Sequence, residues 1–162
     1  MKLKKQIAVI VLALTATTSL VWGQDRQALS SPTAQTLQGT WRVTRHGVNC
    51  ITGQEVSSFP AIMTFNQGGT YSGYGVPSGG DPAQGTEYGV WQREPGHQNY
   101  SFRFVSYAYT ADGDFDGRIE ATGTLQLTTS DSFTYTSTIQ IFDADGNLIF
   151  TACGRATGTR FE

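Results

Sequence analysis

GTWRVTRHGVNC, residues 39–50, is the stretch that decides the fold of this chain. Its apolar and polar residues alternate, as in a β-strand with one buried face. A second alternating stretch, FTACGRATGTRFE, occupies residues 150–162 at the other end of the chain. Each stretch carries one of the two cysteines, Cys50 and Cys153. Pairing the two stretches would close a sheet on itself and remove both exposed edges.

The same alternation recurs in short runs between these two stretches, and no window keeps a helical period for long. Clusters of Gly, Asp and Asn separate most of the runs and suit tight hairpin turns, which place consecutive strands side by side and antiparallel. We therefore predict an all-β fold, a single eight-stranded antiparallel up-and-down β-barrel over residues 39–162, with a β-sandwich as the alternative. The predicted strands cover residues 40–48, 58–66, 70–76, 88–94, 98–110, 117–129, 132–142 and 147–161.

The N-terminal residues 1–23 contain three lysines, then an apolar run, then small residues, which is the layout of a secretory signal peptide. The alternative is a membrane anchor, but the apolar run is short and loses hydrophobicity through several threonines. Residues 24–38 are polar and without periodicity, and we predict a flexible leader there. The mature chain is then expected to be secreted or periplasmic and to have no membrane span.

An oxidising compartment favours a disulfide between Cys50 and Cys153, the alternative being two free thiols. If the two cysteines are paired across the seam of the barrel, Val43 lies opposite Arg160, and Trp41 lies diagonal to Arg160 on the same face. This register predicts that the Arg160 guanidinium stacks on the Trp41 indole at one end of the barrel. The disulfide would join the seam from outside, near the other end.

The GTW motif at residues 39–41 and the late Arg160 resemble the calycin superfamily, the lipocalins and their relatives. In that family a Gly-x-Trp motif and a late Arg pack together at the closed end of the barrel. The chain departs from true lipocalins because it lacks the long helix before the final segment. Barrels similar to allene oxide cyclases share the same outline and are the second resemblance. Both imply a barrel that holds a small molecule.

Composition argues against a nucleic-acid partner. The chain has 11 basic and 13 acidic residues, a formal net charge of −2. Without the three lysines of the predicted signal peptide the charge falls to about −5, and the remaining arginines are scattered, so no basic stripe exists to neutralise phosphates. We expect a monomer, and no motif calls for a cofactor.

Alternation assigns an apolar and aromatic lining to the barrel interior. An eight-stranded barrel is wide enough either to be filled by its side chains or to hold one small ligand. We predict a binding site for a small hydrophobic or amphipathic molecule, with a filled structural barrel and a cyclase or isomerase as alternatives. An inward Arg45 would favour an anionic head group, unless it turns out to solvent. The candidate ligand-binding residues are Arg45, Phe59, Met63, Phe65, Trp91, Tyr100, Phe102, Phe104, Tyr135 and Phe150.

Other chemical signals are weak. The sequence DGDFDG spaces Asp112, Asp114 and Asp116 as in a calcium loop, but the position that needs a bidentate Glu holds Gly123. We expect these aspartates, together with Glu87 and other loop carboxylates, to make the open mouth acidic. The only two histidines fall at opposite ends of the predicted barrel, and no catalytic triad is assembled.

Overall fold

The computed structural model describes residues 36–76 and 85–161. The predicted signal peptide, residues 1–23, and all but the last three residues of the predicted leader lie outside the described residues. Within the described ranges, no helix is long and apolar enough to cross a membrane.

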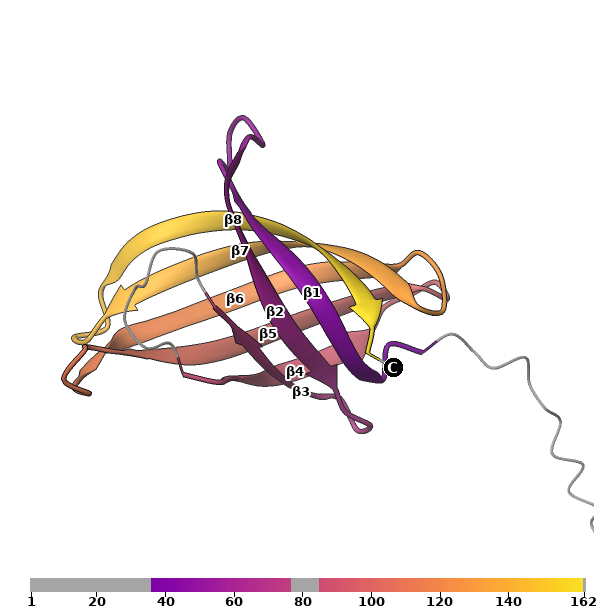
Figure 1. Ribbon diagram of the computed structural model, residues 1–162, viewed down its shortest axis with the longest axis horizontal. Helices are drawn as coiled ribbons and strands as arrows, with labels where there is room; N and C mark the ends of the chain where they lie inside the picture. Colours follow the sequence, from indigo (N-terminus) through magenta and orange to yellow (C-terminus); the bar gives the residue numbers. More distant parts are fainter. Residues whose placement is uncertain (1–35, 77–84, 162) are drawn as a thin grey trace, which may run out of the picture. The chain divides into compact units, whose positions relative to one another are not determined.

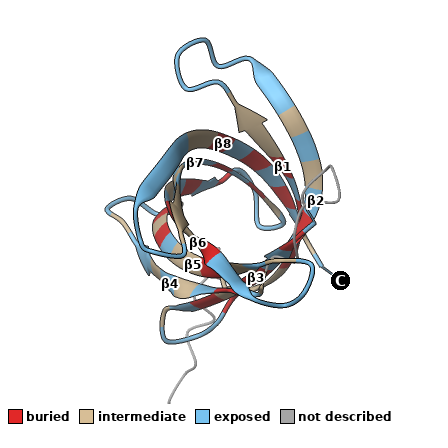
Figure 2. Ribbon diagram, turned by 90° about the vertical axis from the view of Figure 1, so that its left-hand side faces the viewer, coloured by how far each residue is buried: buried red, intermediate tan, exposed pale blue. Residues whose placement is uncertain are grey.

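Eight strands form a closed antiparallel barrel in which each strand pairs with its neighbours in chain order and β1 pairs with β8 (Figure 1). Viewed from the end that carries the β5–β6 and β7–β8 turns, the strands surround one axis, and the β1–β2 hairpin projects away from the ring (Figure 2). The predicted all-β barrel is confirmed, and the sandwich alternative is wrong. The strands are β1 (Gly39–Val48), β2 (Glu55–Phe65), β3 (Thr70–Gly75), β4 (Glu87–Arg93), β5 (Asn99–Tyr109), β6 (Phe115–Leu127), β7 (Ser132–Asp143) and β8 (Leu148–Arg160).

The seam between β1 and β8 has a register two residues away from the predicted one. Trp41, not Val43, is opposite Arg160, and Val48 is opposite Cys153. The predicted disulfide is present, with Cα atoms of Cys50 and Cys153 5.2 Å apart. However, Cys50 lies in the turn after β1 has ended, so the two cysteines are not a directly paired position. A shift of two residues leaves every side chain on its predicted face.

One end of the barrel is closed by Trp41, which is fully buried. Its indole nitrogen donates to the Leu37 carbonyl at 2.9 Å, and the Arg160 guanidinium lies over the ring, 4.2 Å from the centroid. The Arg160 nitrogens also donate to the carbonyls of Gln38 and Ser130, each at 2.8 Å. Leu37 belongs to the core cluster, so the packed domain extends back into residues assigned to the flexible leader.

Inward-facing side chains become more exposed from this closed end towards the other. Along β7, Phe133 and Tyr135 are buried, whereas Ile139 and Ile141 are half-buried. Along β8 the same progression ends at Phe150, which is 60% exposed. The closed half of the barrel is therefore a packed core, while the opposite half, which we call the open half, keeps an apolar interior that solvent reaches.

Candidate functional site

A buried polar cluster occupies the barrel interior between the packed core and the open half. It consists of Arg45 from β1, Tyr71 from β3 and Glu87 from β4, with exposures of 7%, 2% and 3%. Arg45 forms two hydrogen bonds to the Glu87 carboxylate, Nη1 to Oε1 at 2.5 Å and Nη2 to Oε2 at 2.8 Å. The Tyr71 hydroxyl donates to Glu87 Oε2 at 2.5 Å and accepts from Arg45 Nη2 at 3.1 Å. Such a paired arrangement offsets the cost of burying two charges.

The glycines of β3 make room for this cluster. Gly73 and Gly75 alternate with outward-facing residues and point into the barrel, as Tyr71 does. A Cβ at Gly73 would collide with the Tyr71 hydroxyl and lie 2.5 Å from Glu87 Oε2, and one at Gly75 would lie 3.3 Å from Arg45 Nη1. The inward face of β3 thus contributes one tyrosine that forms hydrogen bonds and two glycines that leave space for the cluster.

Burial and the neighbouring charges keep the tyrosines of the site neutral. Burial, with a further contribution from the Glu87 charge, raises the pKa of Tyr71 well above its ordinary value. Burial also raises the pKa of Tyr135 to about 12, against the lowering effect of the Arg45 charge. Burial alone would lower the pKa of Arg45, but its hydrogen bonds to Glu87 and the electrostatic contributions of Tyr135, Glu87 and Tyr71 together outweigh this effect and raise it. The guanidinium therefore stays charged, and both hydroxyls remain hydrogen-bond donors.

The cluster leaves one donor of Arg45 without a partner. Arg45 Nε is buried and makes no hydrogen bond, whereas Nη1 bonds to Glu87 and Nη2 bonds to Glu87 and Tyr71. A buried donor without an acceptor costs about 1–3 kcal/mol. Arg45 pairs with Ala156 across the seam, and Ala156 pairs with Tyr135, so Arg45 and Tyr135 face each other across one small residue. An acceptor next to Arg45 Nε would relieve this cost.

The structure divides the ten predicted ligand-binding residues into three groups. Arg45 is part of the cluster, with its guanidinium 5.6 Å from the centroid of the Phe104 ring, and Phe59 lies beside Gly75. Tyr135 belongs to the core and Phe104 packs against it, but both also lie next to Arg45. Phe150 lies at the exposed start of β8. The other five belong to or pack against the core of the closed half: Met63, Phe65, Trp91, Tyr100 and Phe102.

Two residues of the cluster were not among the predicted site residues. Glu87 was expected in an acidic mouth loop, but it is the first residue of β4 and points inward. The sequence does indicate that Glu87 faces inward, because Trp91 faces inward and every second residue before it, Gly89 and then Glu87, lies on the same face. Tyr71 follows from the same rule, counted back along β3 from Gly73.

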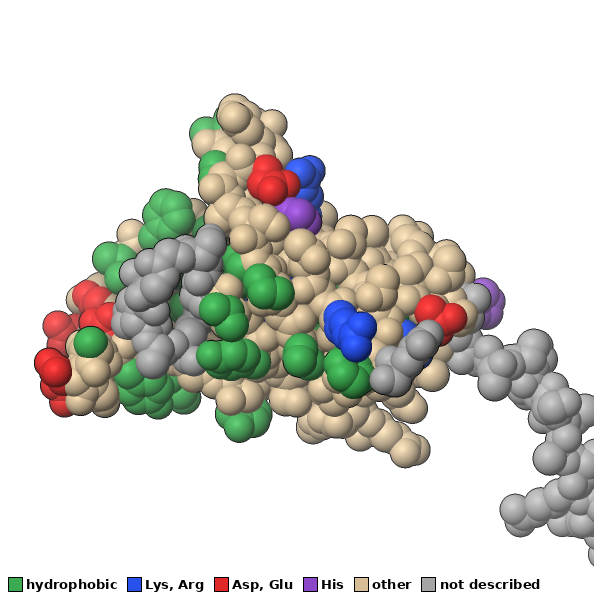
Figure 3. Space-filling model, viewed as in Figure 1, with side chains coloured by type: hydrophobic (Ala, Val, Ile, Leu, Met, Phe, Trp, Pro, Cys, Tyr) green, Lys and Arg blue, Asp and Glu red, His purple; other side chains and the backbone are tan. Residues whose placement is uncertain are grey.

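Carboxylates do gather at the open end of the barrel, around the β5–β6 and β7–β8 turns (red in Figure 3). These are the exposed residues Asp112, Asp114, Asp116 and Asp145 and the half-buried Asp143. No three His, Cys, Asp or Glu side chains come together to hold a metal within residues 36–76 and 85–161. The Asp114 backbone amide instead closes an ordinary turn by donating to the Thr110 hydroxyl at 3.1 Å. Asp112 and Asp114 therefore lie in the hairpin turn between β5 and β6.

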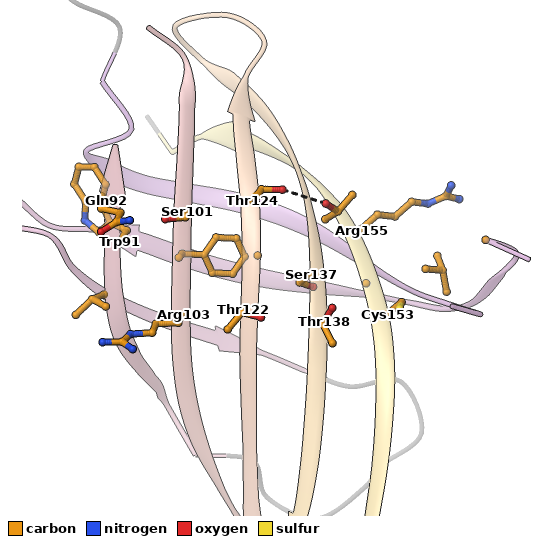
Figure 4. A pocket seen from close by; sticks show the side chains of 17 residues that line it. Trp91, Gln92, Ser101, Arg103, Thr122, Thr124, Ser137, Thr138, Cys153 and Arg155 are labelled. Atoms are coloured by element: carbon orange, nitrogen blue, oxygen red, sulfur yellow. Dashed lines mark hydrogen bonds between the residues drawn. The ribbon is translucent and has the colours of Figure 1, made fainter. Parts of the chain in front are cut away.

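A broad hollow of about 990 Å³ lies on the outer face of β4–β8. Its lining mixes serine and threonine hydroxyls with apolar and charged side chains, and the Thr124 and Thr136 hydroxyls lie 3.3 Å apart. Figure 4 shows Ser101, Thr122 and Thr138 spread over different strands, and they do not converge on one point. The hollow therefore lacks the concentrated polar anchor that the interior has.

A scan against protein-family models and a search of curated proteins find no match. Among solved structures, this chain is similar to the S-type phycobiliprotein lyase CPES from Guillardia theta, with 13% sequence identity and a TM-score of 0.40. The alignment covers 77% of this chain and 88% of that one. A closed eight-stranded barrel is also the architecture that the sequence resemblance to calycins implied.

Proposed function

We propose that the protein is a binding barrel for one small, largely apolar molecule, held in the open half with its polar end at the Arg45–Glu87–Tyr71 cluster. The observation that carries this proposal is the buried cluster, with its unpartnered Arg45 Nε, beneath an apolar interior that solvent reaches. Small-molecule sites typically combine apolar walls with a few placed polar groups.

The walls of the open half support the proposal. Their inward positions are apolar but only half-buried: Phe59, Phe104, Ile119, Ile139, Ile141 and Ala152. Exposed apolar surface costs about 25 cal/mol for each Å² that water contacts. A ligand that covers these side chains recovers that free energy, whereas a filled barrel would already have buried them.

An isomerase or cyclase of the same outline is less well supported. Its base would need a carboxylate oxygen free to accept a proton from the substrate. The Glu87 carboxylate already accepts hydrogen bonds from Arg45 and from Tyr71. The geometry suits holding a polar group in place better than moving a proton.

We also propose that the protein acts outside the cytoplasm, as the sequence of residues 1–23 predicts. The disulfide between Cys50 and Cys153 supports an oxidising compartment.

Two adjacent residues of β8 provide a matched test. Ala152 faces inward and pairs with Ile139, whereas Thr151 faces outward and pairs with Gln140. Ala152→Trp would occupy the open half, so the Kd of the neutral dye Nile red should rise at least about tenfold, while Thr151→Trp should leave it unchanged. Fluorescence titration gives the Kd, and thermal melting checks that each variant folds.

Native mass spectrometry of the protein purified without denaturant complements this titration. A bound small molecule that leaves on denaturation would identify the natural ligand by its mass. Equal dye binding by wild type and both variants, or no dye binding by wild type, would overturn the proposed function.

A further inference from the structure

Resting on the proposed function, we infer that the polar end of the ligand is an uncharged hydrogen-bond acceptor, such as a carbonyl or ester oxygen, rather than a carboxylate. The inference contradicts the expectation from the sequence that an inward arginine would bind an anionic head group. It follows from three features of the described residues: the charge of the cluster, its free donors and the charge around the mouth.

The first feature is that Arg45 already has its carboxylate. Glu87 occupies the edge of the guanidinium that presents Nη1 and Nη2, at 2.5 and 2.8 Å. A guanidinium offers a carboxylate two bidentate edges, and Glu87 fills this one. On the other edge, formed by Nε and Nη2, the Tyr71 hydroxyl already accepts from Nη2 at 3.1 Å. The pair carries no net charge, and a second carboxylate beside Glu87 would be a buried like charge.

The second feature is the kind of hydrogen-bonding group that remains. Arg45 Nε can only donate, and it has no partner. Tyr135 faces Arg45 across Ala156, and its hydroxyl stays protonated because burial raises its pKa to about 12. The Tyr135 hydroxyl also interacts with the Arg45 guanidinium, so the two side chains are close together. A single neutral oxygen next to both would accept one hydrogen bond from Arg45 Nε and one from the Tyr135 hydroxyl.

The third feature is the entrance. The turns around the open end carry the exposed Asp112, Asp114 and Asp145 and the half-buried Asp143. Arg118, which lies on β6 near these turns, is already paired with Glu120 at 2.6 Å. The negative potential of this rim disfavours the approach of an anion.

The test uses four probes with one alkyl chain and different ends: dodecan-2-one, dodecanoate, dodecylammonium and dodecane. Each competes with Nile red at pH 7 on wild type, Tyr135→Phe and Glu87→Gln. We expect wild type to bind the ketone at least about tenfold more tightly than the acid or the amine. Tyr135→Phe should lower ketone affinity about fivefold and leave dodecane unaffected, because only the ketone uses the hydroxyl.

Glu87→Gln keeps the shape of the side chain but removes its charge, so Arg45 becomes an uncompensated cation. The preference for ketone over acid should fall by at least about tenfold or reverse in this variant. If Glu87→Gln does not fold, the wild-type preference and the Tyr135→Phe effect decide the matter alone. Tightest binding of dodecanoate or dodecylammonium by wild type would overturn the inference and leave the proposed function standing. Failure of all four probes to displace the dye would overturn both.

Discussion

At the scale of single residues, the site depends as much on missing side chains as on present ones. Arg45, Tyr71 and Glu87 come from three strands, and their contacts need the space that Gly73 leaves. Arg45 was recognised as inward-facing from the sequence, because it follows Trp41 and Val43 in alternation. Its partner Glu87 was not, because the Gly- and Pro-rich residues before it suggested that the loop continued up to Tyr88.

Gly73→Ala should disrupt the cluster more than its small size suggests. The added methyl group would overlap the Tyr71 hydroxyl and press on Glu87, so the buried hydrogen bonds must lengthen or break. Overpacking of this kind costs about 1–3 kcal/mol. Urea unfolding measures the loss. Ser72→Ala, at the neighbouring outward position, is the matched control and should change stability by no more than about 0.5 kcal/mol. Equal stability of the two variants would mean that β3 shifts freely and does not fix the cluster.

At the scale of elements, the strands could be predicted but the seam register could not. Alternation and turn residues placed all eight strands, and most of the strand ends fall within one or two residues of the predicted positions. The register depended on assuming that Cys50 and Cys153 are directly opposed. Cys50 instead reaches Cys153 from a turn, where no strand pairing fixes its position. Spacing in the sequence does not reveal whether a cysteine lies within a strand or just after it.

The disulfide should stabilise the closure of the barrel substantially. It joins positions 103 residues apart, and a loop of that size corresponds to about 2–5 kcal/mol. The double variant Cys50→Ser with Cys153→Ser should lose this amount in urea unfolding, as should wild type after reduction. The β1–β8 hydrogen bonds and the Trp41–Arg160 contact remain, so circular dichroism should still report a folded β protein. Identical unfolding midpoints for reduced and oxidised wild type would contradict a stabilising role.

At the scale of the whole molecule, the barrel is divided into a packed half and an accessible half. The inward residues of both halves are apolar, so alternation alone could not separate a filled barrel from a hollow one. The difference arises from how side chains from eight strands meet across the axis, with large rings from Trp41 and Phe133 in edge contact at the closed end. Tyr71 and Tyr135 lie near the boundary between the halves, and burial raises the pKa of both, so their ionisation is linked to the stability of the folded barrel.

This linkage predicts a loss of stability at high pH. Folded Tyr135 keeps its proton up to a pKa of about 12, whereas in the unfolded chain a tyrosine ionises near 10. Its contribution is complete below pH 10 and is lost as the pH rises from about 10 to 12, because the unfolded state then releases a proton that the folded state retains. Tyr71 acts in the same direction. Urea unfolding of wild type between pH 9 and 12 should therefore show a falling free energy of unfolding, by up to about 1.4 kcal/mol per pH unit for each tyrosine.

Tyr135→Phe should make this decline shallower, once its difference from wild type at pH 9 is subtracted. Tyrosinate absorbance of the folded protein at pH 11 should be nearly equal in the two proteins, because Tyr135 is still largely protonated. Parallel stability curves, or a clear loss of absorbance in the variant, would show that Tyr135 is not held neutral inside the barrel.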